Sequence, residues 1–424
     1  MTEVASALCL VMILLVPLAA LGLALMNTGL GRSRSAAHTM LTALCMVATA
    51  ALAYFVCGFS WQGVAGHAAR VFTVNGKPWS WTGAEPPFFG GLPLDGSAPS
   101  LVALLQMLSA GLAALIPLGA GTDRWRLGPA CASSALMAAF IYPLFAHWAW
   151  GGGWLAQLGS YYGMGRGYLD AGGAGCIHVT GGLAALSIAW ILGPRRGKYA
   201  ASGMAAAIPG HHTVFVLASC FLVWLGWCGL NSSGAMLFAG VAPGTLVLVA
   251  VNTTLSGGMS ALAAAVTTRA RFGRPDASLC ANGWVGGLVA SSAGCAFMSP
   301  AVAALTGLLA GALVTLSVEW IDVYLGVDDP GGAVSVHAIA GVWGLLALGL
   351  FGRVPASQWL AQLVGVATLV GFVLPLVYGA NWLLNRFLPQ RVSAEGEWQG
   401  MDLYELGAGA YPEFATHRED FMQR

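Results

Sequence analysis

Long apolar runs dominate the chain and predict its architecture. Runs of about 20 residues are long enough to cross a hydrocarbon core about 30 Å thick. They lie at residues 4–26, 38–58, 100–121, 128–150, 172–193, 212–237, 244–267, 279–298, 301–323, 333–352 and 359–388. Backbone polar groups need internal partners in lipid, so helices are expected. The pattern predicts an all-α membrane protein with eleven transmembrane helices.

Composition supports a membrane location. Of the 424 residues, 8% are charged and 57% hydrophobic, whereas a soluble protein carries about 25% charged residues. The first apolar run follows only Glu3, without the basic residues of a secretory signal, so we expect it to be retained as a span. The net charge of +1 and the scattered basic residues offer no nucleic-acid surface.

The loops predict an orientation. With the N-terminus outside, fourteen of the 18 Lys and Arg residues fall on inward loops and the C-terminal tail. The positive-inside rule therefore predicts a cytoplasmic C-terminus. We expect residues 1–388 to form one transmembrane domain and residues 389–424 a polar cytoplasmic tail. The long outward loop at 60–99 carries three tryptophans, and we expect it to form an ordered cap at the membrane interface.

One motif is written twice. The stretch "LDAGGAGCIHVTGG" at 169–182 recurs as "DDPGGAVSVHAIAG" at 328–341, and both contain D-x-G-G-x4-H-x3-G. The copies open the fifth and the tenth predicted spans. Because five is odd, the second half enters the membrane in the opposite direction, which predicts two inverted five-helix repeats plus a C-terminal helix. In such folds the functional site lies near mid-membrane, where the halves meet.

The repeated histidines are the strongest candidates for function. His178 and His337 each lie eight residues, or about 12 Å of helix, beyond the aspartate of their own copy of the motif. Starting from opposite faces, they reach similar depth and can meet. Gly182 and Gly341, four residues further on, permit close helix approach. The alternative is that each histidine is a polar residue bonding across packed helices, although the symmetric pair favours a functional role.

The aspartates of the motif have a different expected role. Asp170 and Asp329 precede a glycine pair and an apolar helix, where a carboxylate can accept hydrogen bonds from free backbone N–H groups. We interpret both as structural support for the site.

The sequence lacks the motifs expected of a metalloprotease or a serine hydrolase. No Cys, Asp or Glu stands at ligand spacing from either histidine, so no metal site and no cofactor is predicted. H-E-x-x-H and G-x-S-x-G are both absent. Neutral imidazoles offer a donor and an acceptor on one ring, which suits a pathway for a small hydrogen-bonding solute or a proton.

The chain resembles the ammonium transporter, methylammonium permease and Rhesus protein family, in its bacterial branch. The resemblance implies eleven helices, an outward N-terminus and a homotrimer with one pore per subunit. It rests on six stretches in this order: "LMNTGLGRSR", "AHWAWGGGWLAQLG", "LDAGGAGCIHVTGGLAAL", "FLVWLGWCGLNSSGA", "VDDPGGAVSVHAIAGVWG" and "EGEWQGMDLYELGAGAYPE".

The resemblance also implies roles for single residues. His178 and His337 match the family's twin histidines, which line the conduction path. Trp150 matches the tryptophan of the outer vestibule, where an indole face attracts ammonium. Asp170 matches the carboxylate beneath that vestibule, which organises backbone carbonyls. The family mechanism implied is loss of a proton near the vestibule and passage of neutral ammonia along the imidazoles.

Four positions depart from the family pattern. Leu105 and Ser109 stand where a phenylalanine pair is expected, Leu230 stands at the other gate phenylalanine, and Gly234 stands at the vestibule serine. A weaker gate is one interpretation, because aliphatic side chains can also close a constriction by dewetting. The other interpretation is that neighbouring aromatics substitute, and the candidates are Phe140, Trp224, Trp227 and Phe238.

The leading hypothesis is a channel-like transporter of ammonium or ammonia, with methylammonium as a further candidate substrate, in a bacterial inner membrane. One alternative is an ammonium sensor that binds but conducts poorly. Another is a channel for a gas or small neutral solute, suggested by the missing gate aromatics. An enzyme is the least favoured class. The expected partners are membrane lipid, two further copies of the chain and, by resemblance, a PII-type signalling protein at the tail.

Overall fold

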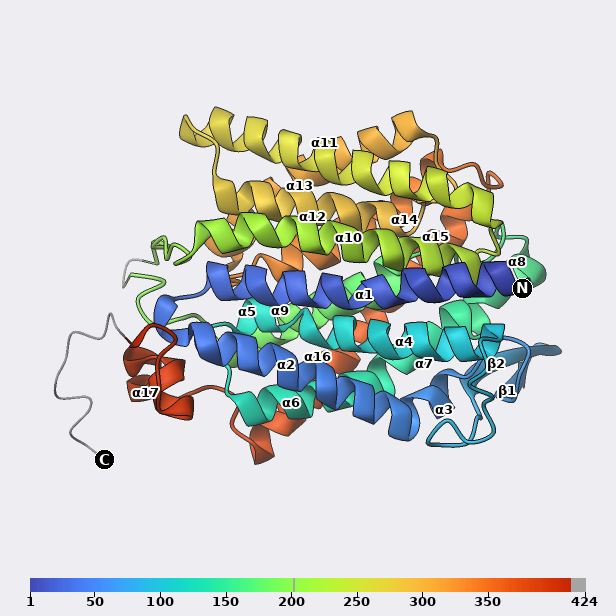
Figure 1. Cartoon of the computed structure of the whole chain (residues 1–424), viewed down its shortest axis with the longest axis horizontal. Helices are drawn as coiled ribbons and strands as arrows, with labels where there is room; N and C mark the ends of the chain where they lie inside the picture. The colour runs from blue at the N-terminus through green and yellow to red at the C-terminus, as the bar shows by residue number, and fades with distance from the viewer. Residues whose placement is uncertain (201–202, 413–424) are drawn as a thin grey trace.

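The computed structural model describes residues 1–200 and 203–412. Its helices run side by side along the long axis of the molecule (Figure 1). The main helices are α1 (Glu3–Leu30), α2 (Ala36–Ala53), α4 (Ala98–Leu115), α6 (Leu127–Leu136), α7 (Tyr142–Trp150), α9 (Thr180–Leu192), α10 (Thr213–Phe238), α11 (Leu246–Phe272), α12 (Ala277–Ser292), α13 (Pro300–Leu325), α14 (Ala340–Phe351), α15 (Gln358–Thr368) and α16 (Leu374–Phe387).

Shorter pieces join or cap these helices. The short α-helices are α3 (Phe59–Gln62), α5 (Leu118–Gly121), α8 (Trp154–Tyr162) and α17 (Ala394–Gln399). The 3₁₀ turns are η1 (Ser33–Ser35) and η5 (Pro243–Thr245). The π-helical turns are η2 (Tyr54–Gly58), η3 (Met137–Ile141), η4 (Ala174–Val179), η6 (Val334–Ile339), η7 (Leu369–Val373) and η8 (Asp402–Leu406).

The chain forms the membrane-spanning helical bundle that the apolar runs predict. Among the described residues, ten helical segments are long and apolar enough to cross a membrane. The eighth predicted span, 279–298, is the exception, because α12 there has only 16 residues. Residues 293–298 leave the helix, and Asn252 Nδ2 donates to the carbonyls of Cys295 and Met298. This side chain satisfies backbone groups that lipid could not.

Proline explains two of the π-helical turns. Pro143 and Pro375 are each the second residue of a helix, α7 and α16, and the turns η3 and η7 directly precede them. Proline has no N–H to donate to the preceding turn, so the hydrogen bonding is rearranged there. Each of the predicted spans 128–150 and 359–388 is therefore one helical segment that contains a π-helical turn.

The two halves of the chain pack against each other in a reciprocal way. The first helices of the halves, α1 and α10, lie side by side (Figure 1). A Cβ on Gly226 would overlap the backbone of Ala19, so this close approach needs a small residue. Further along each half, α9 packs against η6 and α14 packs against η4. The exchange agrees with the predicted inverted repeat.

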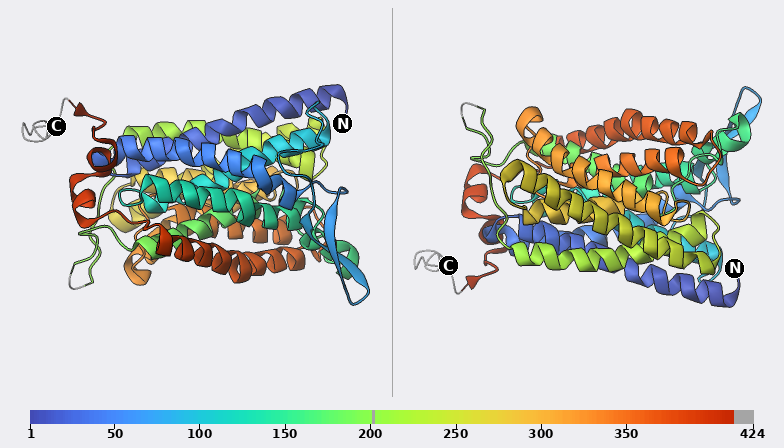
Figure 2. Two further views of the ribbon diagram at one scale, coloured as in Figure 1. Left: turned by 90° about the horizontal axis from the view of Figure 1, so that it is seen from below. Right: turned by 90° about the horizontal axis from the view of Figure 1, so that it is seen from above.

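The loop 60–99, which the sequence predicts to face outward, contains a hairpin that the all-α prediction omitted. Strand β1 (Ala69–Val74) pairs antiparallel with β2 (Lys77–Gly83), and Phe72 lies opposite Trp79. The turn between them is Asn75–Gly76, both with positive φ, which is the sequence preferred in two-residue hairpins. The hairpin lies at the same end of the molecule as the N-terminus (Figure 2).

The tail is docked rather than freely solvated over its described residues. Helix α17 and turn η8 lie at the end opposite the N-terminus (Figure 1). Three tail carboxylates, on Glu397, Asp402 and Glu405, bind loops and helix ends of the bundle. The donors from the bundle are the backbone N–H groups of Arg196, Ala37, His38 and Leu127 and the side chains of His38 and Arg126, and Arg391 of the tail itself also donates to Glu397. The rest of the predicted tail, 413–424, lies outside the described residues.

Candidate functional site

Two π-helical turns carry the repeated histidines. His178 lies in η4 before α9, and His337 lies in η6 before α14. Their ring centroids are 5.4 Å apart with an interplanar angle of 29°. Both side chains are buried, with 0% and 3% of the residue exposed. The structure thus brings the two rings together, in π-helical turns of the kind that are frequent at functional sites.

The ring nitrogens have almost no protein partners. Within the described chain, neither nitrogen of His178 nor Nδ1 of His337 has a hydrogen-bond partner. Buried polar groups are normally paired, because leaving one unpaired costs about 1–3 kcal/mol. Paired packing histidines would bond across helices, and these do not. The arrangement suits rings that bind a passing solute.

Glycines set the distance between the two histidine helices. A Cβ on Gly182 would overlap Ala338, the residue after His337. A Cβ on Gly341 would lie 2.6 Å from Cγ2 of Val179, the residue after His178. The close approach expected of these two glycines is confirmed, and each of them contacts the other half of the repeat.

Asp170 organises the backbone at the start of η4. Its carboxylate accepts hydrogen bonds from the N–H groups of Gly173, Gly175 and Cys176 at 2.9–3.0 Å. Gly173 has φ 91°, a left-handed conformation that favours glycine and turns the chain back over the carboxylate. Burial raises the pKa of Asp170 to about 6, although backbone hydrogen bonds from Cys176 and Gly175 oppose this shift.

Asp329 occupies the equivalent place before η6 and is less completely bonded. Its Oδ2 accepts a hydrogen bond from the Val334 N–H at 2.7 Å, and within the described chain Oδ1 has no partner. Burial raises the pKa of Asp329 to about 6. The preceding Asp328, which the repeated motif does not include, binds Arg195 through both carboxylate oxygens. The doubled aspartate at 328–329 was the available signal.

Trp150 is fixed to the segment that leads into η4. Its Nε1 donates to the Asp170 carbonyl at 2.7 Å, so the indole is fixed to the same segment that carries the carboxylate. The Phe238 ring stacks on it with centroids 4.3 Å apart and an interplanar angle of 11°. Both side chains are half-buried.

The four departures from the family pattern lie in the core of the bundle. Leu105, Ser109 and Leu230 are each 1% exposed, so aliphatic and small side chains fill the space where aromatics were expected. Gly234 is tightly enclosed, because a Cβ there would overlap the Ala171 carbonyl oxygen. A serine would not fit at this position without a backbone shift.

Two of the four candidate substitute aromatics contact predicted site residues. Phe238 stacks on Trp150, and Trp227 stacks on His178 with centroids 4.6 Å apart and an angle of 12°. Trp227 also donates from Nε1 to the Ser292 hydroxyl. The other two point elsewhere: Trp224 donates to the Thr254 hydroxyl, and Phe140 is 49% exposed.

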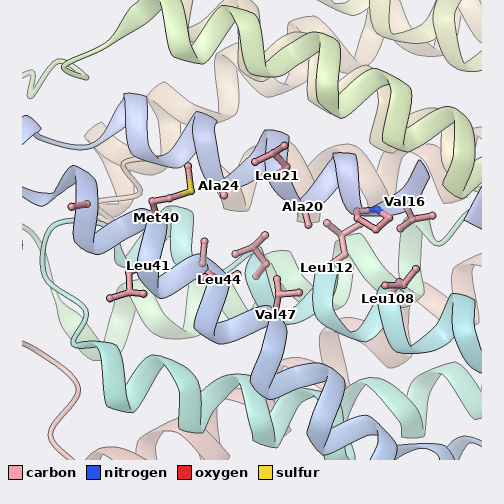
Figure 3. A pocket seen from close by; sticks show the side chains of 14 residues that line it. Val16, Ala20, Leu21, Ala24, Met40, Leu41, Leu44, Val47, Leu108 and Leu112 are labelled. Atoms are coloured by element: carbon pink, nitrogen blue, oxygen red, sulfur yellow. The ribbon is translucent and has the colours of Figure 1, made fainter. Parts of the chain in front are cut away.

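The apolar groove in Figure 3 is separate from the histidine pair. It has a volume of about 630 Å³ and lies between α1, α2 and α4, with Leu21, Leu41 and Leu44 among its lining residues (Figure 3). These three side chains are 36–68% exposed on the outside of the bundle. A second cavity of about 470 Å³ is lined by charged as well as apolar side chains, and Asp329 and Ser335 on its wall belong to the His337 motif.

Known proteins share this architecture and sequence. The sequence model of the Ammonium Transporter Family matches residues 7–411. Ammonium transporter Amt2 of Archaeoglobus fulgidus is 33% identical over 419 residues, which cover 93% of this chain and 85% of that protein. The ammonium transporter of Bacillus subtilis is 28% identical over 416 residues, covering 94% of this chain and 96% of its own.

Solved structures give the same result. A protein described as a sensor Amt protein matches with a TM-score of 0.85 and 27% identity, over 95% of this chain and 98% of its own. Mep2 of Candida albicans matches with a TM-score of 0.77 and 24% identity, over 97% of this chain and 90% of its own, and bears on the fold alone. The chain therefore belongs to the ammonium transporter family.

Proposed function

We propose that this protein moves ammonium, as ammonia along the lumen, through a pore lined by His178 and His337. Family membership makes the chain an integral membrane transporter rather than an enzyme, with ammonium as the substrate class. The observation that carries the finer proposal is the buried imidazole pair, 5.4 Å apart, whose nitrogens have almost no protein partners. Unpaired donors and acceptors at that depth are suited to a small solute that can both donate and accept hydrogen bonds.

The chemistry follows from the cost of burying a charge. A bare ammonium ion would lose its hydration in the apolar lumen, which is expensive, whereas neutral ammonia would lose little. Ammonium would therefore bind near Trp150, transfer its proton to solvent water at the vestibule and continue as ammonia. Asp170 and Asp329 would support the backbone of the two histidine turns. Leu105, Ser109 and Leu230 would form the constriction, and Gly234 would line the vestibule.

The assembly and topology that accompany this function are also proposals. We infer a homotrimer in the bacterial inner membrane, surrounded by lipid, with the N-terminus outside. Residues 1–388 would form the transport domain and residues 389–424 a cytoplasmic tail. Docking of that tail through Glu397, Asp402 and Glu405 supports a regulatory role, for which a PII-type protein is the proposed partner.

An ammonium sensor is the second candidate. One specific observation favours it, the match at a TM-score of 0.85 to a solved structure described as a sensor Amt protein. A channel for a small neutral solute is the third, because Leu105, Ser109 and Leu230 leave the constriction without aromatic rings.

Purified protein in liposomes distinguishes these functions. On addition of ammonium, a transporter gives a sustained current or, if transport is electroneutral, sustained uptake of the solute. A sensor gives a transient charge movement without uptake. Uptake of an uncharged solute with no response to ammonium would contradict the proposal and support the third function.

The histidine pair has its own test. We expect His178→Ala and His337→Ala each to abolish most ammonium flux while leaving the protein folded. Within the described chain, both nitrogens of His178 and Nδ1 of His337 lack a hydrogen-bond partner, so these substitutions break no hydrogen bond there. The double variant should lose little more than either single one, because residues that act as a unit are non-additive. Flux is normalised to correctly assembled protein. Full flux in the double variant would reduce the pair to a packing role.

A further inference from the structure

One face of α10 carries an aliphatic residue at the predicted gate position and an aromatic residue two turns away. Leu230, Gly234 and Phe238 are spaced by four residues, so they follow one another along the same side of the helix. Leu230 stands at the family's gate position and is aliphatic. Phe238 lies two turns further along, about 12 Å toward the N-terminal end of the molecule. The ring on this face is therefore at the vestibule and not at the constriction.

Three features of the structure place the Phe238 ring against Trp150. Trp150 is fixed by its hydrogen bond to the Asp170 carbonyl at 2.7 Å. Gly234 has no Cβ, so α10 approaches the neighbouring Ala171 carbonyl closely. Phe238, one turn beyond Gly234, then reaches the indole and stacks at 4.3 Å and 11°. The chain ends α10 at this residue, and Gly240 follows with φ 66°.

We propose that Phe238 is a specificity-determining residue, which with Trp150 forms the aromatic site for the incoming ammonium ion and narrows the entrance to it. The inference rests on the proposed function and adds a residue to it. A parallel pair presents the outer face of each ring, and a cation over a ring face is attracted by its quadrupole. Both side chains are half-buried, so each remains reachable from the vestibule.

Two properties follow from an aromatic pair at the entrance. Ammonium recruitment depends on the π system of Phe238, so loss of the ring weakens binding without slowing passage past the histidines. The bulk of the ring also disfavours methylammonium, which is larger than ammonium by one methyl group. A purely structural Phe238, which only keeps Trp150 in place, would also be rescued by tyrosine but would predict no change of selectivity, so the inhibition by methylammonium distinguishes the two roles.

The test compares Phe238→Leu with Phe238→Tyr. Leucine keeps apolar packing and removes the π face, whereas tyrosine keeps both. Phe140→Leu is the matched control, because Phe140 is an aromatic residue of the same bundle that is 49% exposed and contacts Trp61 instead of Trp150. For each purified variant in liposomes, the half-saturating ammonium concentration, the maximal flux and the inhibition by methylammonium are measured.

We expect Phe238→Leu to raise the half-saturating concentration about two- to fivefold, with maximal flux unchanged and stronger inhibition by methylammonium. Phe238→Tyr and Phe140→Leu should match the unmodified protein. Unchanged affinity and selectivity in Phe238→Leu would overturn the proposal, as would a loss confined to maximal flux. If the unmodified protein carries no flux, the proposed function fails, and the same comparison on ammonium-binding curves decides the role of Phe238.

Discussion

Gly182 and Gly341 fix how closely the two histidine helices approach. A Cβ on Gly182 would overlap Ala338, so we expect Gly182→Ala to force the helices apart and destabilise the fold by about 1–3 kcal/mol, as overpacked cores do. Gly258→Ala in α11 is the control, since nothing lies within 4 Å of a Cβ there. The measurement is thermal unfolding of the purified protein. Equal loss of stability in both variants would show that helical glycines in general, and not this contact, are responsible.

The histidines and their glycines were predictable because the sequence repeats them. Their spacing from the helix start is equal in both halves, and an inverted repeat brings equal depths together. The aromatic partners Trp227 and Phe238 carry no such signal. The chain holds 16 tryptophans and 17 phenylalanines, and only the packing of α10 against the neighbouring segments selects these two.

At the scale of elements, the docked tail gives a pH prediction through Glu405. Burial opposes ionisation, but hydrogen bonds from His38, the Leu127 N–H and Arg126 outweigh it and hold the pKa of Glu405 below its usual value. The ionised carboxylate therefore stabilises docking above the free pKa of about 4.3, and this contribution is lost as pH falls through the lower docked pKa. Docking should not vary between pH 6 and 8 on account of this group.

Protease cleavage within the tail measures that docking. We expect Glu405→Gln to speed cleavage at pH 7 on the order of tenfold, because the charge-assisted bonds are lost. Glu395→Gln should have no effect, since Glu395 is exposed on α17. Equal cleavage rates for the unmodified protein and Glu405→Gln would mean that Glu397 and Asp402 hold the tail without Glu405.

Helices were predictable from hydropathy to the extent that they were long and uninterrupted. The shorter α12 was not, because its apolar run continues to residue 298 while Asn252 satisfies the carbonyls of a non-helical stretch. The π-helical turns η3 and η7 have a local cause in Pro143 and Pro375. The length of an apolar run does not reveal the effect of a proline within it. The Asn75–Gly76 pair between two strand-like segments is a local signal for a hairpin. A search for long apolar runs does not detect it.

At the scale of the whole molecule, the fold separates two polar ends. The β1–β2 hairpin and the N-terminus lie at one end, and α17 lies at the other (Figures 1 and 2). Sequence predicted this polarity because an odd number of spans puts the termini on opposite sides. It could not supply the docking of the tail, which depends on side chains far apart in the chain.

The orientation of these two ends in the membrane is the last prediction. Fourteen of the 18 Lys and Arg residues fall in the loops and tail that the sequence predicts on the α17 side, so the positive-inside rule predicts that this end lies in the cytoplasm. A recognition sequence for a specific protease is inserted in the turn at Asn75–Gly76 in one variant and after Arg424 in another. In intact cells, external protease should cut only the hairpin variant, and in inverted membrane vesicles only the tail variant. The reverse pattern would invert the topology and place Trp150 at the cytoplasmic entrance, whereas the expected pattern makes it the external one.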